Sequence, residues 1–487
     1  MPEYLSPGVY VEEVPSAVKP IAGVSTSTAC FLGIVPDSID VPGENPDYDP
    51  TGRSADPNSK SPFILKPFKF YSDADLQAKA DSVKKAKDAL DQNKDPKAAS
   101  ALVKALRDAQ DDQAQAQLPA KNMEPILCTN FTDFKKRFGG FSTDGLGEMT
   151  SDLAGQPPKA GLQNRLAHAV YGFFDNGGTR VYVMRFKTAA ELLDSENLEP
   201  LEAIEEISLI AAPGIADKNV QENLIDHCEK MSTRFAILDP PELPASSELT
   251  VDKIKVAENS DYAALYFPRI AIFDIAAQLT KPELADPTKL GEIHNGEIWI
   301  GPSGHLAGIY ARVDHERGVH KAPANEVIRG ARDVEFQVSK SVQDGLNPYG
   351  ANCLRYVNDG FKVWGARTIG GDANTDLKYI NVRRTLIFLR ESIDRGTQWV
   401  VFEPNDRSLW AKIVRNVSAF LTTVWQDGAL FGSTPAEAFY VKCDDELNSP
   451  ADRDLGRVTT EIGVAIVRPA EFVIFRISQW SGPQGQS

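Results

Sequence analysis

Residues 458–477 read VTTEIGVAIVRPAEFVIFRI. From Val458 to Ile466, apolar or β-prone residues occupy every second position, which is the period of a half-buried β-strand. Arg468-Pro469 interrupts this run, because proline lacks the backbone N–H that a strand donates to its neighbour. Residues 471–477 are again rich in aromatic and β-branched side chains and predict a second extended segment. A strand this apolar needs a partner along its edge, because an open apolar edge promotes aggregation.

A similar strand is predicted near the front of the chain. Residues 9–14 (VYVEEV) are β-prone, and Pro15 ends them. Residues 16–27 are rich in Pro, Gly, Ser and Thr, which is typical of a flexible arm. The two terminal strands either tuck into their own domain or join the sheets of neighbouring copies by β-strand addition. The residues of these two strands are Val9, Tyr10, Val11, Glu12, Val14, Phe472, Val473, Ile474, Phe475 and Ile477.

Residues 4–14 (YLSPGVYVEEV) resemble the opening of the contractile tail sheath proteins, those of phage tails and phage-derived injection particles. Four more stretches are similar to the same family and follow its order: residues 169–178 (AVYGFFDNGG), 301–331, 363–368 (VWGART) and 461–476. The resemblance covers the chain except for about residues 37–123. It implies a subunit that stacks in hexameric rings around an inner tube and contracts to drive the tube through a target envelope. It also implies that the N- and C-terminal arms are woven into adjacent subunits.

Composition limits the classes of partner. The chain has 487 residues, which suffices for two to four domains, and a formal net charge of -16. This acidity disfavours nucleic acid or an anionic membrane as the main partner. The resemblance implies other partners: further copies of the chain, an inner tube protein, and baseplate and cap or terminator components.

The cysteines and the apolar runs suggest where the protein is made. Five scattered cysteines without a CxxC pair argue against a disulfide framework or a zinc site and fit a reducing cytosol. The sequence shows neither a signal-peptide pattern nor a run long enough to span a membrane. We expect assembly in a bacterial cytoplasm, as part of a phage tail or of a particle that is later released.

The first third of the chain alternates between apolar and polar segments. Residues 28–35 predict a buried strand, and the polar, proline-rich residues 36–62 predict a loop or linker. Beyond residue 72, Leu76, Val83 and Leu90 recur every seven residues before a break at 93–96, and a second apolar stripe follows. This pattern predicts a helical hairpin, and we interpret residues 37–123 as an insertion into the core of the family.

The middle of the chain predicts a βαβ unit. Residues 207–212 and 235–238 are apolar strands on either side of a helical stripe, so they should pair in parallel through a right-handed crossover. The loop after the first strand has neither GxGxxG nor GxxxxGK[ST], which argues against nucleotide binding. Ser303 lies outside any GxSxG motif, so it is not predicted to be a nucleophile. The spacings of His294, His305, His315 and His320 match no metal-ligand pattern, and no metal or cofactor is predicted.

The last third carries two predicted helices. Residues 398–402 predict a strand that ends at Glu403, a position where barrel enzymes often place a catalytic carboxylate. Residues 404–408 instead favour a helix start, which runs to Gly428 along a wide apolar stripe. The helix before it, residues 379–393, is apolar on one side. Its other side carries Arg383, Arg384, Arg390 and Arg395, which is either a solvated face or a surface that grips an acidic partner. Because the resemblance implies a tube-proximal domain here, these arginines are candidate contacts with the inner tube.

The sequence therefore predicts a non-enzymatic, multi-domain sheath subunit of mixed α/β (α+β) class. Its predicted parts are an N-terminal arm (1–27), an outer α/β region (28–330) with the hairpin insertion (about 37–123), an inner domain that faces the tube (331–468) and a C-terminal arm (469–487). No catalytic residue is predicted. Two alternatives stay open: a baseplate or terminator scaffold that shares the sheath core, and an α/β hydrolase or nucleotide-binding enzyme built on the βαβ unit.

Overall fold

The computed structural model of the protein describes residues 20–51, 61–93, 95–142, 161–244, 247–275, 297–474 and 476. The chain forms two compact units. The large unit comprises Thr26–Arg384 and Arg468–Ser487, and the small unit comprises Met1–Ser25 and Thr385–Val467. The chain therefore crosses between the units after Ser25, Arg384 and Val467.

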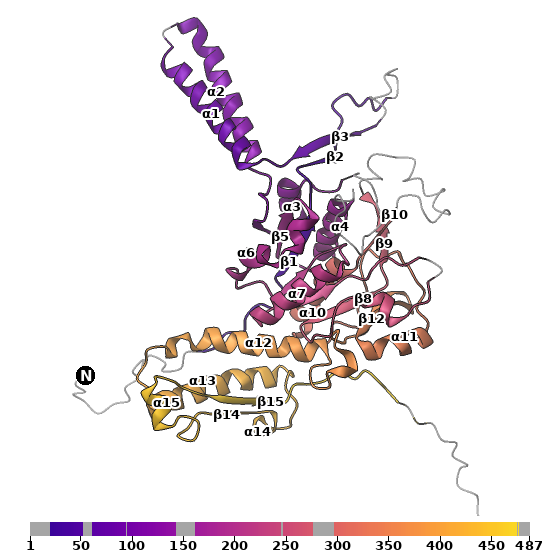
Figure 1. The fold of residues 1–487 in the computed structure, drawn as a ribbon, viewed down its shortest axis with the longest axis vertical. Coiled ribbons are helices and arrows are strands. Elements are labelled where there is room, and N and C mark those ends of the chain that lie inside the picture. The colour runs from indigo at the N-terminus through magenta and orange to yellow at the C-terminus, as the bar shows by residue number, and fades with distance from the viewer. Residues whose placement is uncertain are drawn as a thin grey trace, which may run out of the picture. The chain divides into compact units, whose positions relative to one another are not determined.

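An eight-stranded sheet organises the large unit (Figure 1). Its order is β13 (Gly360–Trp364), β12 (Ala351–Val357), β8 (Ala263–Phe267), β7 (Phe235–Leu238), β6 (Leu209–Ala211), β1 (Ala29–Ile34), β5 (Val181–Phe186) and β4 (Pro125–Cys128). The six central strands pair in parallel, while β13 and β4 pair antiparallel at the two edges. The mixed α/β class is confirmed, as are the buried strand β1 and the parallel βαβ unit of β6, α7 (Lys218–Met231) and β7.

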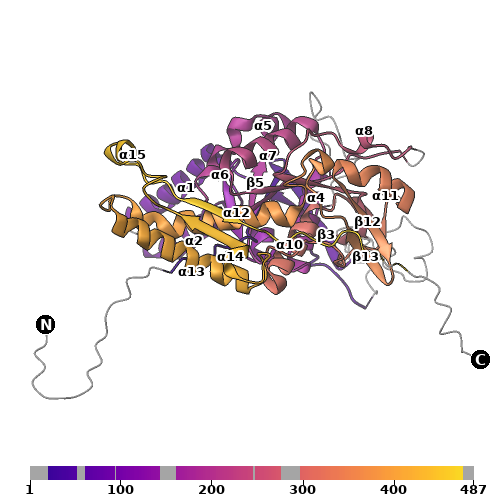
Figure 2. The ribbon, with the colours of Figure 1, turned by 90° about the horizontal axis from the view of Figure 1, so that it is seen from below.

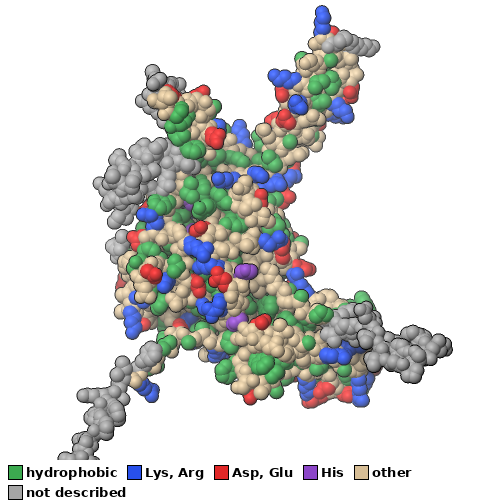
Figure 3. Space-filling model, turned by 180° about the vertical axis from the view of Figure 1, so that it is seen from behind, with side chains coloured by type: hydrophobic (Ala, Val, Ile, Leu, Met, Phe, Trp, Pro, Cys, Tyr) green, Lys and Arg blue, Asp and Glu red, His purple; other side chains and the backbone are tan. Residues whose placement is uncertain are grey.

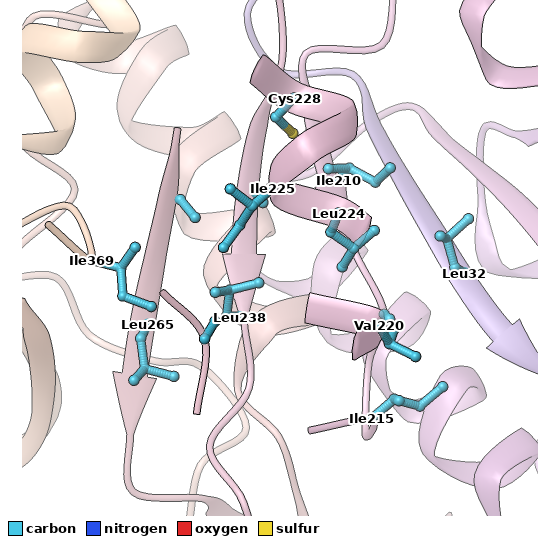
Figure 4. Close-up of a cluster of buried hydrophobic side chains, with 14 of the residues drawn as sticks. Leu32, Ile210, Ile215, Val220, Leu224, Ile225, Cys228, Leu238, Leu265 and Ile369 are labelled. Atoms are coloured by element: carbon cyan, nitrogen blue, oxygen red, sulfur yellow. The ribbon is translucent and has the colours of Figure 1, made fainter. Parts of the chain in front are cut away.

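Helices cover both faces of this sheet. Side chains alternate between the faces along each strand, so the apolar strands have apolar side chains to bury on both faces. On one face, Leu32 of β1 and Leu238 of β7 belong to the core cluster that contains Val220 and Leu224 of α7 (Figure 4). On the other face, Phe31 contacts Phe173 of α4 (Leu162–Asp175) edge-on, at 5.6 Å between ring centroids. Because both faces are buried, the central strands are nearly continuous apolar runs.

Two helices on the second face, α4 and α10 (Ser303–Arg317), approach each other closely through small residues. A Cβ added to Gly304 would lie 2.5 Å from the carbonyl oxygen of Ala169. One added to Gly308 would lie 2.4 Å from the carbonyl oxygen of Phe173. Glycine at these positions lets the two backbones pack without an intervening side chain.

Shorter elements complete the large unit. A three-stranded antiparallel sheet contains β10 (Glu297–Ile300), β9 (Ile270–Phe273) and β11 (Asp333–Val334). Further α-helices among the described residues of this region are α3 (Phe131–Phe138), α5 (Ala189–Leu193), α6 (Glu199–Glu202), α8 (Val251–Ile254) and α11 (Lys340–Leu346). Asn176 and Gly177 follow the end of α4, and Gly177 adopts a positive φ of 110°.

The prediction of a loop or linker over residues 36–62 is wrong at its start. Residues 38–44 form β2 (Ser38–Glu44), which pairs antiparallel with β3 (Phe63–Lys69). Ile39 is buried and anchors the strand, although the surrounding Pro, Asp and Glu residues hide its alternation in the sequence. Proline is compatible with a strand where its missing N–H faces away from the partner.

The predicted helical hairpin is present as α1 (Asp73–Asp91) and α2 (Pro96–Ala116), an antiparallel pair (Figure 1). Ser72 and Asp75 form a capping box at the start of α1, and the side chain of Asp95 accepts from the N–H of Lys97 at the start of α2. Lys79 and Asp112 join the two helices at 2.6 Å. No residue of α1 is buried, and acidic and basic side chains are interspersed over the hairpin (Figure 3).

The small unit is built around two helices. They are α12 (Ile380–Thr397), which belongs to this unit from Thr385 onward, and α13 (Arg407–Gln426). Its core includes Leu389, Trp410, Val417 and Leu421. A two-stranded sheet of β14 (Phe439–Lys442) and β15 (Glu461–Val464) lies against α13 (Figure 2), and two short helices, α14 (Pro435–Ala438) and α15 (Pro450–Asp454), accompany it.

The predicted strand over residues 398–402 is wrong. Helix α12 continues to Thr397, and Gln398–Val400 forms a single 3₁₀ turn. Trp399 and Val400 pack against the core of the small unit, so helical packing outweighs their β-propensity. The predicted alternating strand over residues 458–466 is shorter than expected: β15 covers four of these residues, and Ile466 adds an isolated bridge to Leu430.

The expected change of domain near Ala331 differs from the division into units. Strand β11 pairs with β9, and β12 pairs with β8, so residues 333–357 continue sheets that begin before residue 331. The compact units change at Arg384 instead. The roles expected for these parts, an outer region and an inner domain that faces a tube, stay predictions.

Candidate assembly surfaces

The β14–β15 sheet offers edges to which a further strand can bind. Phe439 pairs with Val464 and Val441 pairs with Ile462, and these side chains pack on the core of the small unit. Tyr440 points outward, is 53% exposed and donates to Glu461. Among the residues that the structure describes, no third strand joins this pair. A two-stranded sheet is marginal by itself, and its unpaired N–H and C=O groups are a template for strand addition.

A carboxylate fixes the chain just after it re-enters the large unit. Glu471 accepts from Arg367 at both oxygens, at 2.8 Å from Nε and 2.8 Å from Nη2. The amide of Asn347 donates to the same carboxylate at 2.8 Å, and the hydroxyl of Tyr379 donates at 2.9 Å. Burial raises the pKa of Glu471, but the hydrogen bonds from Arg367, Asn347 and Tyr379 outweigh it and hold that pKa below its usual value. We call these four residues the Glu471 clamp.

Beyond the clamp, the described apolar residues of the predicted C-terminal strand are exposed in this chain. Phe472, Val473 and Ile474 are 71%, 67% and 78% exposed, and none of them belongs to a strand. Three consecutive large apolar side chains in water are unfavourable unless a partner covers them. The other residues predicted for the terminal strands lie outside the described part of the chain: Val9, Tyr10, Val11, Glu12, Val14, Phe475 and Ile477.

Residues 20–25, which come after the predicted N-terminal strand, are held in the small unit. Ile21 is buried in the core of this unit and packs where Gly396 leaves room for it. The N–H of Val24 donates to the hydroxyl of Ser392 at 3.1 Å, and Gly23 packs on Phe388. Residues 20–25 therefore follow α12 rather than forming the free linker that their composition predicts.

The four arginines predicted as tube contacts do not share one environment. Arg384 is buried, donates to Asp314 and to the carbonyl oxygen of Thr26, and lies over the ring of Tyr310. Burial lowers the pKa of Arg384, but Asp314 outweighs that effect and raises it. This arginine is an internal group and is unavailable to a partner. Sequence reasoning missed its burial because Asp314 comes from a different helix, α10.

The other three arginines differ in exposure. Arg383 forms an ion pair with Asp261 and lies over the ring of Tyr262, at 4.2 Å from the ring centroid. Arg395 pairs with Glu391 one turn earlier on α12, at 2.5 Å. Arg390 is exposed and has no ion pair to any residue in the described ranges. Of the predicted set, Arg390 and the partly exposed Arg395 stay candidates for contact with a partner.

The features that an enzyme would use already have structural roles. Asp239 is buried and accepts from the N–H of Gly214 (2.9 Å) and from the N–H and hydroxyl of Ser303 (2.8 and 2.9 Å). Burial raises the pKa of Asp239 to about 6. The N–H of Gly214, in the loop after β6, is therefore bonded to Asp239 rather than available to a nucleotide phosphate. The hydroxyl of Ser303 also donates to Asp239.

The histidines that the sequence analysis considered, and Glu403, lie in different environments where the structure describes them. The ring of His305 packs on Gly172 in the core, and burial lowers the pKa of His305 to about 3. His315 is exposed, whereas His294 lies outside the described residues. Glu403 is exposed, and Asp406 caps α13 through the N–H of Leu409, as predicted. Within the described ranges, no group of three His, Cys, Asp or Glu side chains is placed to hold a metal ion.

Two parts of the chain match models of known protein families. Residues 193–369 match the phage tail sheath protein central domain, and residues 372–479 match the phage tail sheath C-terminal domain. The two matches together span more than half of the chain. The chain belongs to the contractile tail sheath family. The matched C-terminal domain of this sheath chain contains β14, β15 and Glu471.

Relatives of the sheath chain come from phages and a prophage. It is 25% identical over 393 residues to a prophage major tail sheath protein of Pseudomonas aeruginosa strain UCBPP-PA14, which covers 75% of this chain and 89% of the relative. It is 29% identical over 182 residues to the tail sheath protein of Burkholderia phage BcepMu, which covers 36% of this chain and 35% of the relative.

Solved sheath structures share the fold. The sheath of the PVC extracellular contractile injection system in its contracted state aligns with a TM-score of 0.62 and 22% identity, over 99% of both chains. The contracted helical sheath of the anti-feeding prophage aligns with a TM-score of 0.58 and 22% identity, over 97% of this chain and 99% of the other. The fold of the sheath chain is thus that of a contractile sheath. Over the described residues, no helix is both long enough and apolar enough to cross a bilayer.

Proposed function

We propose that this chain is a non-enzymatic mechanical subunit, which stacks in hexameric rings around an inner tube and contracts to drive the tube through a target envelope. The observation that carries the proposal is the presence, in one chain, of an open two-stranded sheet and of an exposed apolar segment that follows the fixed residue Glu471. Residues 472–474 follow the Glu471 clamp and are exposed, while β14 and β15 have unpaired edges among the described residues. Each copy supplies a strand and an acceptor, so a contact between copies is heterologous and repeats.

Strand exchange suits a lattice that contracts. Backbone hydrogen bonds between an added strand and a sheet hold neighbours together, whatever the orientation of the bulky domains. The domains are then free to repack from an extended arrangement to a compact arrangement of lower free energy. Contraction of this kind releases stored packing energy and needs no nucleotide bound to the subunit.

The proposed partners are those expected of a member of the sheath family. They are further copies of the chain, an inner tube protein, and baseplate and cap components, without a direct role for nucleic acid or membrane insertion. We propose assembly in a bacterial cytoplasm, followed by incorporation into a phage tail or a released particle.

A second candidate is a closed-ring scaffold in a baseplate. The chain aligns with a chain of the anti-feeding prophage baseplate with a TM-score of 0.58 and 22% identity. A ring component would stop after one layer, whereas a sheath subunit continues to polymerise.

The test is negative-stain microscopy of the purified chain and of two truncations, one lacking residues 1–14 and one lacking residues 472–487. The intact chain should form striated tubes, alone or with its inner tube protein. Both truncations should remain folded by circular dichroism and stay monomeric in size-exclusion chromatography. Tubes of normal length from either truncation would refute the strand exchange, and single rings from the intact chain would favour the baseplate alternative.

A further inference from the structure

The clamp around Glu471 is built into the framework of the large unit. Arg367, which grips both carboxylate oxygens, is 4% exposed and also donates to Asp372 at 3.0 Å and to the carbonyl oxygen of Asn347 at 3.1 Å. Bidentate arginine–carboxylate pairs are among the stronger and more directional hydrogen-bonded contacts. All four donated hydrogen bonds to Glu471 come from groups that the fold already holds in place.

A continuous path connects this clamp to the central sheet. The N–H of Arg367 donates to the side chain of Asn352 at 2.7 Å, and the amide of Asn352 donates to the carbonyl oxygen of Leu265 at 3.1 Å. Asn352 lies in β12 and Leu265 in β8, two strands in the eight-stranded sheet. A pull on residue 471 is therefore resisted by the core of the large unit rather than by a surface loop.

The N-terminal side of the chain is anchored in the other unit. Ile21 is buried in the core of the small unit, and Val24 is bonded to Ser392 of α12. The segments that lead to the two terminal arms thus start from different compact units: the N-terminal one from the small unit, and the C-terminal one from the large unit. The proposed acceptor sheet, β14–β15, belongs to the small unit.

We propose that Glu471 and Arg367 form the anchor that carries the load of the C-terminal arm, so that tension from a neighbouring copy acts on the large unit while tension on the N-terminal arm acts on the small unit. This inference rests on the proposed strand exchange between copies. It assigns to Glu471 and Arg367 a positioning role: they set the point from which residues 472–474 leave the subunit. Movement of neighbours in the lattice then pulls on two separate bodies in each subunit.

The test compares Glu471→Gln with a matched control, Glu335→Gln. Glu335 also receives a bidentate arginine, Arg269, at 2.9 and 2.5 Å, and is similarly shielded from solvent. In both variants the arginine keeps a second carboxylate, Asp372 for Arg367 and Glu242 for Arg269. Each substitution therefore removes the charge of a carboxylate that is paired with a buried arginine. In Glu471→Gln this carboxylate lies at the start of the C-terminal arm, and in Glu335→Gln it lies outside the arm.

Two measurements decide the outcome. In the unassembled chain, Glu471→Gln should speed cleavage by chymotrypsin after the exposed Phe472 at least tenfold, because proteolysis needs a mobile chain on both sides of the cleaved bond, while Glu335→Gln leaves this rate unchanged. In polymerisation assays, Glu471→Gln should raise the critical concentration about tenfold, which corresponds to about 1.4 kcal/mol. Tyr379→Phe removes one of the four hydrogen bonds and should give a smaller shift of the same sign, which covers the case in which Glu471→Gln fails to fold.

The alternatives are distinguishable. An unchanged cleavage rate in Glu471→Gln, or equal loss of assembly in Glu335→Gln, would overturn the anchor. If deletion of residues 472–487 leaves assembly intact, the strand exchange fails and the load-bearing role falls with it, whatever the cleavage rates show. If that deletion abolishes assembly while Glu471→Gln assembles at the wild-type concentration, the strand exchange stands and the anchor alone is refuted.

Discussion

Arg384 and Asp314 form a two-pronged ion pair, with 2.9 Å between Nη1 and Oδ1 and 2.6 Å between Nη2 and Oδ2. The side chains are 4% and 5% exposed. The hydroxyl of Thr26 donates to Asp314 at 2.6 Å, and its carbonyl oxygen accepts from Arg384 at 2.9 Å. Thr26 and Arg384 are the residues at which the chain enters and leaves the large unit, so Asp314 ties two of the three chain crossings to α10.

We expect Asp314→Asn to destabilise the large unit by about 3 kcal/mol or more, because it leaves the buried guanidinium of Arg384 without a charged partner. Urea unfolding of the unassembled chain measures the effect. Asp445→Asn is the control: its pair with Arg407 is exposed on both sides, and such pairs contribute at most about 1 kcal/mol. Equal losses in the two variants would show that the buried pair has no special role.

Close packing of α4 on α10 gives a second prediction. Alanine is a better helix former than glycine, yet Gly304→Ala and Gly308→Ala should each destabilise the chain by about 1–3 kcal/mol, because the new Cβ meets backbone atoms of α4. Gly345→Ala in α11 is the matched control, since an added Cβ there has no atom within 4 Å. It should stabilise by up to about 1 kcal/mol. Melting temperatures measure both the expected losses and the expected gain in stability. A stabilising effect of alanine at position 304 or 308 would contradict the close packing of α4 on α10.

Local patterns were sufficient to predict several elements of the fold. Strands such as β1 and the β6–α7–β7 unit were predictable because continuous apolar runs and helical stripes are visible within about 15 residues. Residues 398–402 were mispredicted because Trp399 and Val400 pack on a core that forms only in the tertiary structure. The burial of Arg384 depends on Asp314, and the role of Glu471 depends on Arg367 and Asn347. Such polar contacts between distant residues leave no periodic signal, so the sequence predicted an apolar, extended segment over residues 471–477 but neither its exposure nor the clamp at Glu471.

The buried ring of His305 predicts a dependence of stability on pH. Burial is the main cause that lowers the pKa of His305 to about 3, and His168 contributes to the same direction. An unfolded histidine has a pKa near 6.5, so between about pH 6.5 and pH 3 the unfolded chain binds more protons at this position than the folded chain does. His305 therefore makes the free energy of unfolding fall as pH falls through this window, by up to about 1.4 kcal/mol per pH unit.

The measurement is urea unfolding at several pH values between 4 and 7. His305→Phe keeps an aromatic ring against Gly172 and should flatten the dependence relative to the wild type. His315→Phe, at an exposed position on the same helix, should leave the wild-type slope unchanged. A wild-type slope in His305→Phe would show that other groups control acid sensitivity.

The last prediction concerns the inner tube. Reversal of Arg383 or Arg384 would disturb ion pairs inside the chain, so only the exposed Arg390 isolates a contact with a partner. We expect Arg390→Glu to leave the melting temperature within about 2 °C of the wild type, because exposed substitutions rarely change stability by more than about 0.5 kcal/mol. Co-assembly with the tube protein should weaken at least fivefold and become less sensitive to salt, because an attractive charge becomes repulsive.

Arg415→Glu on α13 is the control, since Arg415 is also exposed and is not among the predicted tube contacts. Co-sedimentation of sheath with tube at 50 and 300 mM salt checks the result, and equal behaviour of the two variants would remove α12 from the tube interface.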